Sequence, residues 1–321
     1  MKVIVTGAAG FFGQNIVRRL LAEGYTVLGI DDLSVGTRAW LPPVSDRFAF
    51  VCRRIDTLSL KDRDLLGLHR FQGAAVIHLA SKKIPRYGGR ADTLTQNTNM
   101  TVTVANLSRI LGARKFIFFS TSDVYGMQDR FSETDRCIIG QPYIGRWAYA
   151  VSKLWCEQYL HGMPADFNFT VLRIFGSYGP FHALNWTAGP QSVFISQALE
   201  KKELTLHGDG LQTRCFSYVD DIVDGVMAVL DGDFPRETFN LGNPAEEIRI
   251  TDLACRIWRM IAPYDKPRLR YVSHTPLVYE DVPRRVPDIS KATARLGFCP
   301  KTGLTEGLAR TIVWQKNIMG F

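Results

Sequence analysis

Short apolar runs rich in β-branched residues alternate with amphipathic stretches along the first half of the chain. The run KVIVT at residues 2–6 ends at a glycine and predicts a buried strand. Residues 11–23 place Ile16 and Leu20 on one helical face with Arg18 opposite, which predicts a helix. Further strands are expected at 25–30, 48–52, 74–80, 115–120 and 169–175, and further helices around 57–69, 92–112 and 149–160. This alternation predicts an α/β fold: a doubly wound parallel sheet of the Rossmann type, with helices on both faces.

The pattern changes after residue 175. Residues 176–191 are rich in glycine, proline and aromatic side chains and predict a long loop. Beyond this loop we expect a helix at 192–201, a strand at 204–207, a helix beginning at Val219 and a strand at about 237–242. We therefore divide the chain into a Rossmann domain at 1–175 and a smaller region at 176–321, whose strand at 237–242 returns to the main sheet. Neither an internal repeat nor a low-complexity linker separates them, so one packed unit is expected.

Composition narrows the class of protein without changing the predicted fold. With 321 residues, 46% hydrophobic and 22% charged, the chain has the make-up of an ordinary globular protein, which argues against collagen, coiled coil and long disorder. No apolar run approaches the length that crosses a bilayer and no secretion signal is evident, so we expect no membrane partner. The six cysteines form no CxxC pair, and the six histidines show no metal-ligand spacing. We expect a cytoplasmic protein with reduced thiols and no bound metal.

The formal charge of +8 fits either a solvated basic surface or an anionic partner. Basic residues are spread along the chain, and the longest basic runs are doublets such as Arg18-Arg19 and Lys82-Lys83. A nucleic-acid partner is therefore not expected, because a nucleic-acid groove clusters its basic residues. A basic pocket that attracts an anionic small molecule accounts for the surplus better.

Three glycines lie between the first predicted strand and the first predicted helix. Gly7, Gly10 and Gly13 stand in the segment TGAAGFFG. Without a Cβ, such a loop can approach a pyrophosphate closely, and the following helix offers free N–H groups and a partial positive charge. A glycine triplet also fits a plain strand–helix turn, but Asp31 follows the second strand, where a carboxylate can accept hydrogen bonds from ribose hydroxyls. Because that carboxylate would repel a 2′-phosphate, NAD is expected rather than NADP.

A second group of residues can carry acid–base chemistry. Tyr149 and Lys153 stand four apart on a predicted helix and so share a face. Such pairs are common on exposed helices. Beside a dinucleotide site, the pair suggests that the ammonium lowers the pKa of the phenol, so that Tyr149 can accept a proton from a sugar hydroxyl. Residues 120–126, STSDVYG, end a predicted strand at the edge where an α/β sheet binds its ligand, so a hydroxyl there can bind the same substrate oxygen.

These motifs together resemble the extended short-chain dehydrogenase/reductase family of nucleotide-sugar epimerases, dehydratases and decarboxylases. The resemblance covers nearly the whole chain, and its motifs are TGAAGFFG (6–13), DDLSVG (31–36), HLAS (78–81), STSDVYG (120–126), YAVSK (149–153), GDGLQTR (208–214), FNLGN (239–243) and RRVPDISKA (284–292). It implies that the first domain holds a tightly bound NAD, recycled in each catalytic cycle, and that the second region holds the sugar nucleotide. We also expect a homodimer.

The resemblance assigns roles to individual residues. The catalytic residues would be Thr121, Tyr149 and Lys153, and Asn99 would help to set the geometry of the active site. The expected NAD contacts are Gly7, Gly10, Phe11, Phe12, Gly13, Asp31, Asp32, Leu33, Ser34, Gly36, Leu79, Ala80, Ser81, Asn99, Ser120, Tyr149 and Lys153. The expected substrate contacts are Arg86, Tyr87, Thr121, Ser122, Asp123, Gln191, Arg214 and Arg285. Two positions depart from the family pattern: Gly176 replaces the usual asparagine, and the acidic residue of the adenine pocket falls on Arg54 or Asp56.

The same resemblance leaves several outcomes open for the 4-keto sugar that forms when Tyr149 removes the O4 proton and C4 gives up hydride. Dehydratases use an Asp-Glu pair directly after the catalytic threonine, where this chain has Ser122-Asp123. Decarboxylases carry a motif similar to Thr-Ser-Glu, so Asp123 is one methylene shorter. Epimerases need little beyond the three catalytic residues.

A UDP-linked uronate is the expected substrate. Arg86 and Tyr87 resemble a pair in uronate epimerases, whereas HLAS, LGNP and RRVPDI resemble UDP-glucuronate decarboxylases. Because Asp123 replaces the decarboxylase glutamate, we expect a 4-epimerase that interconverts UDP-glucuronate and UDP-galacturonate. The alternative is a UDP-glucuronate decarboxylase that forms UDP-xylose or a UDP-4-keto-pentose. A neutral UDP-hexose 4-epimerase, a dehydratase and a non-catalytic NAD sensor are less favoured, and the sensor is disfavoured because Tyr149 and Lys153 are both present.

Overall fold

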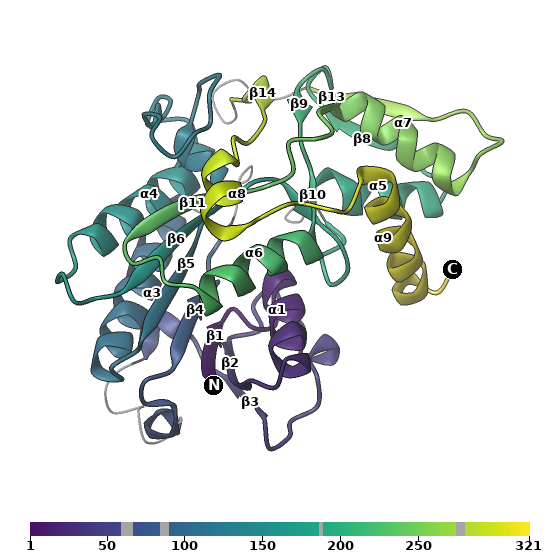
Figure 1. The fold of residues 1–321 in the computed structure, drawn as a ribbon. Helices are drawn as coiled ribbons and strands as arrows, with labels where there is room; N and C mark the ends of the chain where they lie inside the picture. Colours follow the sequence, from purple (N-terminus) through teal and green to yellow (C-terminus); the bar gives the residue numbers. More distant parts are fainter. Residues whose placement is uncertain (59–66, 84–89, 186–188, 274–279) are drawn as a thin grey trace.

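A seven-stranded, wholly parallel sheet forms the centre of the molecule in a computed structural model that describes residues 1–58, 67–83, 90–185, 189–273 and 280–321 (Figure 1). The strand order is β11–β6–β5–β4–β1–β2–β3. The strands are β1 (Lys2–Thr6), β2 (Thr26–Asp31), β3 (Phe48–Cys52), β4 (Ala75–His78), β5 (Lys115–Thr121), β6 (Phe169–Ile174) and β11 (Glu237–Leu241). The order reverses between β1 and β4, so the predicted doubly wound fold is confirmed.

Helices cover both faces of this sheet (Figure 1). On one face α1 (Phe11–Ala22) packs against α6 (Val219–Asp231), and on the other α3 (Arg90–Ile110) packs against α4 (Trp147–His161). Every residue of β5 and of β6 is buried. A strand that is apolar at nearly every position needs cover on both faces, which explains why these strands read as continuous hydrophobic runs instead of alternating ones.

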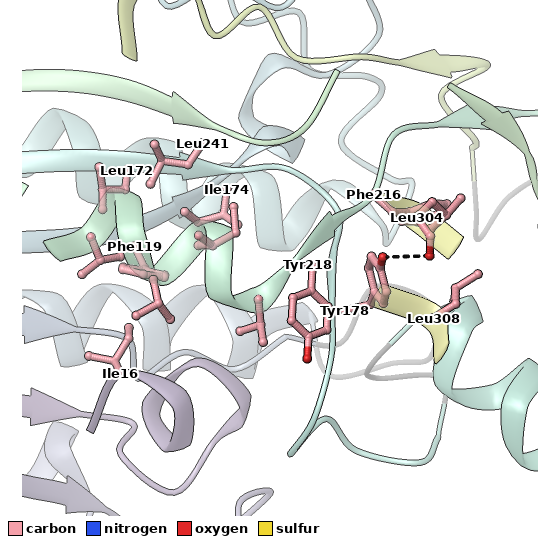
Figure 2. Close-up of a cluster of buried hydrophobic side chains, with 14 of the residues drawn as sticks. Ile16, Phe119, Leu172, Ile174, Tyr178, Phe216, Tyr218, Leu241, Leu304 and Leu308 are labelled. Atoms are coloured by element: carbon pink, nitrogen blue, oxygen red, sulfur yellow. Dashed lines mark hydrogen bonds between the residues drawn. The ribbon is translucent and has the colours of Figure 1, made fainter. Parts of the chain in front are cut away.

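One apolar core joins the two halves of the sequence (Figure 2). It extends from Ile16 of α1 through Leu172 of β6 to Leu304 at the start of α9 (Leu304–Met319). The hydroxyl of Tyr178 donates a hydrogen bond to the carbonyl of Leu304 at 3.3 Å, which satisfies a polar group inside this core. The strand expected at 237–242 is β11, and its Phe239 pairs with Leu172 in the main sheet.

The second half of the chain adds short strands and further helices to this frame. The pairs and small sheets are β7 (Ser177–Tyr178) with β10 (Ser217–Tyr218), β8 (Leu204–His207) with β13 (Leu269–Val272), and β12 (Ile248–Arg249), β9 (Thr213–Arg214) and β14 (Arg284–Arg285) in that order. The helices are α5 (Pro190–Leu199), α7 (Ile250–Ile261), α8 (Ser290–Leu296) and α9. The β9–β14 register sets Arg285 opposite Arg214, which matters for the site described below.

The structure also refines the sequence-based elements. The segment at 176–191, expected to be one long loop, contains β7 and the first turn of α5. Most of the helix expected around 57–69 lies outside the described residues. The described flanks are short 3₁₀ turns, η2 (Ile55–Thr57) and η3 (Leu68–Phe71). Two more such turns are η1 (Arg38–Trp40) and η4 (Ser122–Tyr125). Among the described residues, no helix has the length and apolar character needed to span a membrane.

Candidate functional site

The ends of β1 and β4 form a cradle made almost wholly of backbone. Gly7 has a φ of +72°, and a Cβ built on it would lie 2.8 Å from the amide nitrogen of Ala80. A Cβ at Gly13 would lie 2.2 Å from the carbonyl oxygen of Gly7. No side chain caps the start of α1 at Gly10, and the first turn of α1 holds no acidic residue. The cradle therefore suits the pyrophosphate of a dinucleotide, whose charge would meet the free N–H groups of the helix.

Asp31 lies at the end of β2 beside this cradle. Its carboxylate accepts hydrogen bonds from the amide of Ala9 at 2.9 Å and from the amide of Leu33 at 2.8 Å. Burial raises the pKa of Asp31, and these amide bonds oppose the rise. The carboxylate is thus held rigidly, with acceptor capacity left for a ribose. Asp32 is exposed and accepts from the amide and hydroxyl of Ser34, so it shapes the loop.

Several of the other expected NAD contacts lie around the same cradle. A Cβ at Gly36 would lie 2.4 Å from the carbonyl of Ala9, so residues 31–36 fold back onto the glycine loop. Leu79, Ala80 and Ser81 follow β4 directly. The rings of Phe11 and Phe12 pack against His182 and Phe119, with centroids 4.0 and 5.2 Å apart. These two residues can therefore offer a pyrophosphate their backbone amides but not their side chains.

Tyr149 and Lys153 lie one turn apart on α4, both buried. The ammonium of Lys153 donates to the carbonyl of Phe119 at 2.7 Å. Burial lowers the pKa of Lys153 to about 8, opposed by Cys156 and Glu157. Burial also raises the pKa of Tyr149, the charge of Asp123 adds to the rise, and a hydrogen bond with Ser81 opposes it.

The expectation that Lys153 lowers the pKa of Tyr149 is therefore wrong for this arrangement. The pKa of Tyr149 lies above its ordinary value, because burial and Asp123 dominate its surroundings. The Lys153 ammonium is engaged by the Phe119 carbonyl at the β5 end. The sequence spacing correctly places the two side chains on one face of α4 but does not reveal how deeply that face is buried.

Thr121 ends β5, and its hydroxyl is oriented by Asp123. The Thr121 Oγ1 accepts from the Asp123 amide at 3.2 Å and donates to Asp123 Oδ2 at 3.5 Å, which caps η4. The neighbouring Ser120 differs from expectation, because its hydroxyl donates to Glu157. Glu157 is in turn paired with Arg173 in the protein interior. The Ser120 side chain therefore faces this buried ion pair.

Asn97, and not Asn99, is the asparagine of the site. Asn99 is exposed on α3, whereas Asn97 is buried. The Asn97 side chain accepts from the Lys82 amide at 2.7 Å and donates to the Ser152 hydroxyl at 2.9 Å. Residues two apart on a helix point about 200° apart, so only one of them can face the site. The signal in the sequence was the helical period, because Asn97 shares the buried face of α3 with Thr93.

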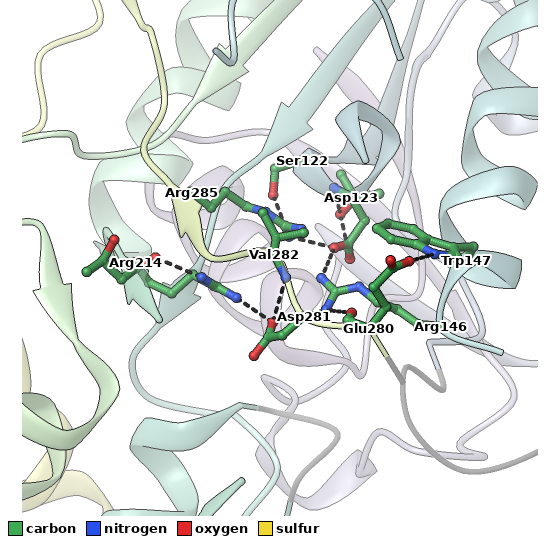
Figure 3. Close-up of polar contacts among 11 residues, drawn as sticks. Ser122, Asp123, Arg146, Trp147, Arg214, Glu280, Asp281, Val282 and Arg285 are labelled. Atoms are coloured by element: carbon green, nitrogen blue, oxygen red, sulfur yellow. Dashed lines mark hydrogen bonds and ion pairs between the residues drawn. The ribbon is translucent and has the colours of Figure 1, made fainter. Parts of the chain in front are cut away.

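An alternating chain of charged side chains connects η4 to the small sheet (Figure 3). Asp123 Oδ1 accepts from Arg285 Nη1 at 2.5 Å and from Arg146 Nη2 at 3.2 Å. Arg146 Nη1 reaches Asp281 Oδ1 at 3.2 Å, and Arg214 Nη2 contacts the same oxygen at 2.7 Å. The structure thus brings together three expected substrate contacts, Asp123, Arg214 and Arg285. It adds Arg146 and Asp281, which no sequence motif indicated.

The arginines set the charge balance of this row of ion pairs. Burial would raise the pKa of Asp123, but Arg285, Arg146 and Lys83 outweigh it and hold that pKa well below its usual range. Asp123 is therefore ionised at neutral pH in the protein without substrate. The buried Ser122 hydroxyl lies 3.5 Å from Arg285 Nη1. The Nε and Nη2 groups of Arg285 are buried and have no hydrogen-bond partner within the described part of the chain, which suits an anionic group of a ligand.

The other expected substrate positions are only partly described. Arg86 and Tyr87 lie outside the described residues. Gln191 is buried in the first turn of α5, and its Nε2 has no hydrogen-bond partner among the residues that the structure describes. At Gly176 a Cβ would lie 3.1 Å from the carbonyl of Cys215 and 3.1 Å from the ring of Phe216. Asparagine at 176 would therefore need this segment to shift.

Comparison with known proteins identifies similar chains over nearly the full length. A family model described as "NAD dependent epimerase/dehydratase family" matches residues 3–242. A UDP-N-acetyl-alpha-D-glucosaminuronate decarboxylase of Bacillus cytotoxicus is 30% identical over 99% of this chain and 98% of its own. UDP-glucuronic acid decarboxylase 4 of Arabidopsis thaliana is 33% identical over 96% of this chain and 67% of its own. The solved UDP-glucuronic acid 4-epimerase of Bacillus cereus, in complex with UDP-glucuronic acid and NAD, has a TM-score of 0.83 at 28% identity and covers 99% of this chain and 100% of its own.

Proposed function

This chain belongs to the NAD-dependent epimerase/dehydratase family, and we propose that it is a UDP-uronate 4-epimerase that works through a 4-keto intermediate. NAD is the cofactor, in line with relatives solved with NAD bound. The cradle at Gly7 and Gly13, where any Cβ would collide with backbone, and the Asp31 carboxylate beside it fit this dinucleotide. When bound, NAD supplies the hydride acceptor for C4 of the sugar.

The chain's own residues perform the proton transfer. Tyr149 would take the proton of the C4 hydroxyl as a general base, and the Thr121 hydroxyl would bind the same oxygen. This step needs the phenolate form of Tyr149, and because burial and Asp123 favour the phenol in the protein alone, the positive charges of Lys153 and of the bound NAD would have to stabilise the phenolate. The depth of α4 in the protein keeps water from this exchange, and Lys153, fixed on the Phe119 carbonyl, supplies a positive charge one turn away. Net epimerisation requires the same groups to act in reverse, after the ketone has presented its other face.

Arg285 is the observation that favours an acidic sugar. Its side chain contacts Ser122 and Asp123, the two residues that follow Thr121 in the sequence. It is buried, and two of its nitrogens lack a partner among the described residues. An unpaired guanidinium N–H in a buried site is costly, and the C6 carboxylate of a uronate would satisfy it with a charge-assisted hydrogen bond. Arg214 on the adjacent strand is suited to the diphosphate of UDP.

The same arginine favours epimerisation over loss of CO₂. In decarboxylation the negative charge leaves the C6 carboxylate and moves into the 4-keto oxygen. A guanidinium that pairs with the carboxylate stabilises the ground state more than the transition state, and so slows that step. Asp123 cannot assist as an acid, because its arginine neighbours keep it ionised. Decarboxylation is the second candidate, because relatives at 30% and 33% identity carry that activity in their names.

One incubation distinguishes the two candidates. The purified enzyme is incubated with UDP-glucuronate, and the products are separated by ion-exchange chromatography with mass detection. UDP-galacturonate, isobaric with the substrate but separate in retention, is the expected product. UDP-xylose would be lighter than the substrate by CO₂, and a UDP-4-keto-pentose by CO₂ and two hydrogens. Either product in place of UDP-galacturonate would identify the enzyme as a decarboxylase. If the enzyme converts UDP-glucose but not UDP-glucuronate, a uronate is not its substrate.

A further inference from the structure

Arg146 occupies the centre of the charged chain in Figure 3. It directly precedes α4, three residues before Tyr149, and it is buried. One guanidinium nitrogen, Nη2, faces Asp123, while the other, Nη1, donates to the Glu280 carbonyl at 3.0 Å and pairs with Asp281. The guanidinium also lies 5.1 Å from the centroid of the Trp147 ring, whose Nε1 donates to the Glu280 carboxylate at 2.9 Å. Arg146 is thus fixed from four sides.

We propose that Arg146 is a positioning residue that holds Asp123 through a two-sided ion pair, and so sets both the Thr121 hydroxyl and the charge that faces Tyr149. The contact path is short. Arg146 pairs with Asp123, and the Asp123 carboxylate accepts a hydrogen bond from the Thr121 hydroxyl at 3.5 Å. The Asp123 amide donates to the same hydroxyl. This inference rests on the proposed function only in taking Tyr149 as the general base.

A guanidinium is suited to this role because it is a rigid fork. Its two terminal nitrogens contact Asp123 and Asp281 at the same distance, 3.2 Å. A single ammonium on a flexible stem cannot contact both carboxylates in this geometry. Lysine at 146 should therefore keep the charge but lose the bridge.

The charged and titratable groups around the two ends define what the bridge controls. Arg285, Arg146 and Lys83 oppose the effect of burial on Asp123. Around Tyr149, burial and the Asp123 charge raise its pKa, Ser81 opposes the rise through a hydrogen bond, and Cys156 on the same helix adds slightly to it. Lys153, on the next turn of α4, is engaged by the Phe119 carbonyl. Removal of Arg146 leaves the Asp123 charge less compensated, so Tyr149 should ionise at a higher pH.

The test is a double-mutant cycle on the NAD-loaded enzyme. The variants are Arg146→Gln, Asp123→Asn and both together, and ionisation of Tyr149 is followed as the phenolate absorbance that Tyr149→Phe removes. Asp123→Asn should ionise at the lowest pH, wild type higher, and Arg146→Gln highest, with about a tenfold change in phenolate fraction at a fixed pH for each single variant. Arg146→Gln should shift the titration less in the Asp123→Asn background than in the wild type, because the part of its effect that passes through the position of Asp123 is then gone.

Two results would overturn the proposal: equal shifts for Arg146→Gln in the wild-type and Asp123→Asn backgrounds, or an Arg146→Gln enzyme that ionises at or below the wild-type pH. Arg146→Lys is the second variant should Gln fail to fold, and it should shift in the same direction as Gln; a lysine enzyme identical to wild type would count against the bridge. Arg284→Gln is the matched control, since Arg284 is on the same β14 strand as Arg285 but pairs with Glu247 in a half-exposed position. The titration needs no sugar nucleotide, so it stands even if UDP-uronate proves not to be the substrate.

Discussion

The buried pair of Glu157 and Arg173 contacts Ser120 near the end of β5, and its removal gives the most sharply defined prediction. Arg173 Nη2 contacts Glu157 Oε2 at 2.7 Å, and its Nε lies 3.2 Å from both carboxylate oxygens. The Glu157 side chain is 4% exposed and that of Arg173 is 9% exposed. Burial works against the Arg173 charge, but the hydrogen bonds and charge of Glu157 outweigh it and hold the pKa of Arg173 above its usual range.

Glu157→Gln should therefore be strongly destabilising. The substitution keeps the shape and one acceptor oxygen but leaves the Arg173 guanidinium buried without a counter-charge, which costs about 3–5 kcal/mol in comparable sites. Because Gln retains one hydrogen bond, we expect the lower end, about 3 kcal/mol. The measurement is urea-induced unfolding of the NAD-loaded protein, followed by tryptophan fluorescence, with the free energy of unfolding extrapolated to water.

A control and a rescue make this prediction refutable. Glu306→Gln breaks an ion pair in which both side chains are exposed, Arg310 at 51% and Glu306 at 54%, and it should cost about 1 kcal/mol or less. Adding Arg173→Met to Glu157→Gln removes the stranded charge, so the double variant should be more stable than Glu157→Gln alone. If Glu157→Gln costs no more than the surface control, or if the double variant is the least stable, the reasoning from an uncompensated buried charge is wrong.

Four further predictions concern residues of the site. Tyr149→Phe should retain bound NAD, measured by absorbance of the denatured protein, and lose about 10²–10⁴-fold in kcat, because only the proton-accepting oxygen is removed. Asp31→Ala should lower the affinity for NAD in a binding titration and reduce the preference of the enzyme for NAD over NADP, since both the ribose acceptor and the repulsive charge disappear. Arg214→Ala should raise KM for the UDP-sugar while NAD affinity stays unchanged; equal losses for both ligands would indicate a folding role through Asp281. Finally, burial lowers the pKa of Lys153 from 10.5 to about 8. Between these pH values the unfolded chain holds a proton on Lys153 that the folded protein has released, so the free energy of unfolding should rise with pH by up to about 3 kcal/mol. Lys153→Met should abolish this rise.

The fold was predictable because its signals are local and repeated. Each central strand is a short run of apolar residues with a glycine or polar residue at its end, and β5 and β6 are buried at every position, as such runs predict. The strands β7, β9, β10, β12 and β14 were not predicted, since two residues carry no periodicity. Their pairing is set by tertiary contacts, such as the register that brings Arg285 opposite Arg214.

The site was predictable only where chemistry demands fixed spacing. Gly7, Gly13 and Asp31 surround one cradle because backbone approach and a ribose acceptor require those residue types at those places. Asn99 was misplaced by two residues, because a motif read letter by letter does not show which side of α3 faces the site. The contact of the Ser120 hydroxyl with Glu157 was missed for a similar reason, since successive residues of a strand point to opposite faces.

The charged chain explains what the surplus of basic residues could not show on its own. Arg146, Arg214 and Arg285 would each be costly to bury alone, and in the protein without substrate Asp123 and Asp281 provide their counter-charges. The diphosphate of a sugar nucleotide would compete with Asp281 for Arg214, whereas a carboxylate at the unpaired nitrogens of Arg285 would leave the Asp123 pair in place. Binding of the diphosphate would then exchange one ion pair for another, and its net gain would be smaller than the new contacts suggest. Discrimination against neutral sugars would arise at Arg285, because only a sugar with a carboxylate would satisfy its buried nitrogens.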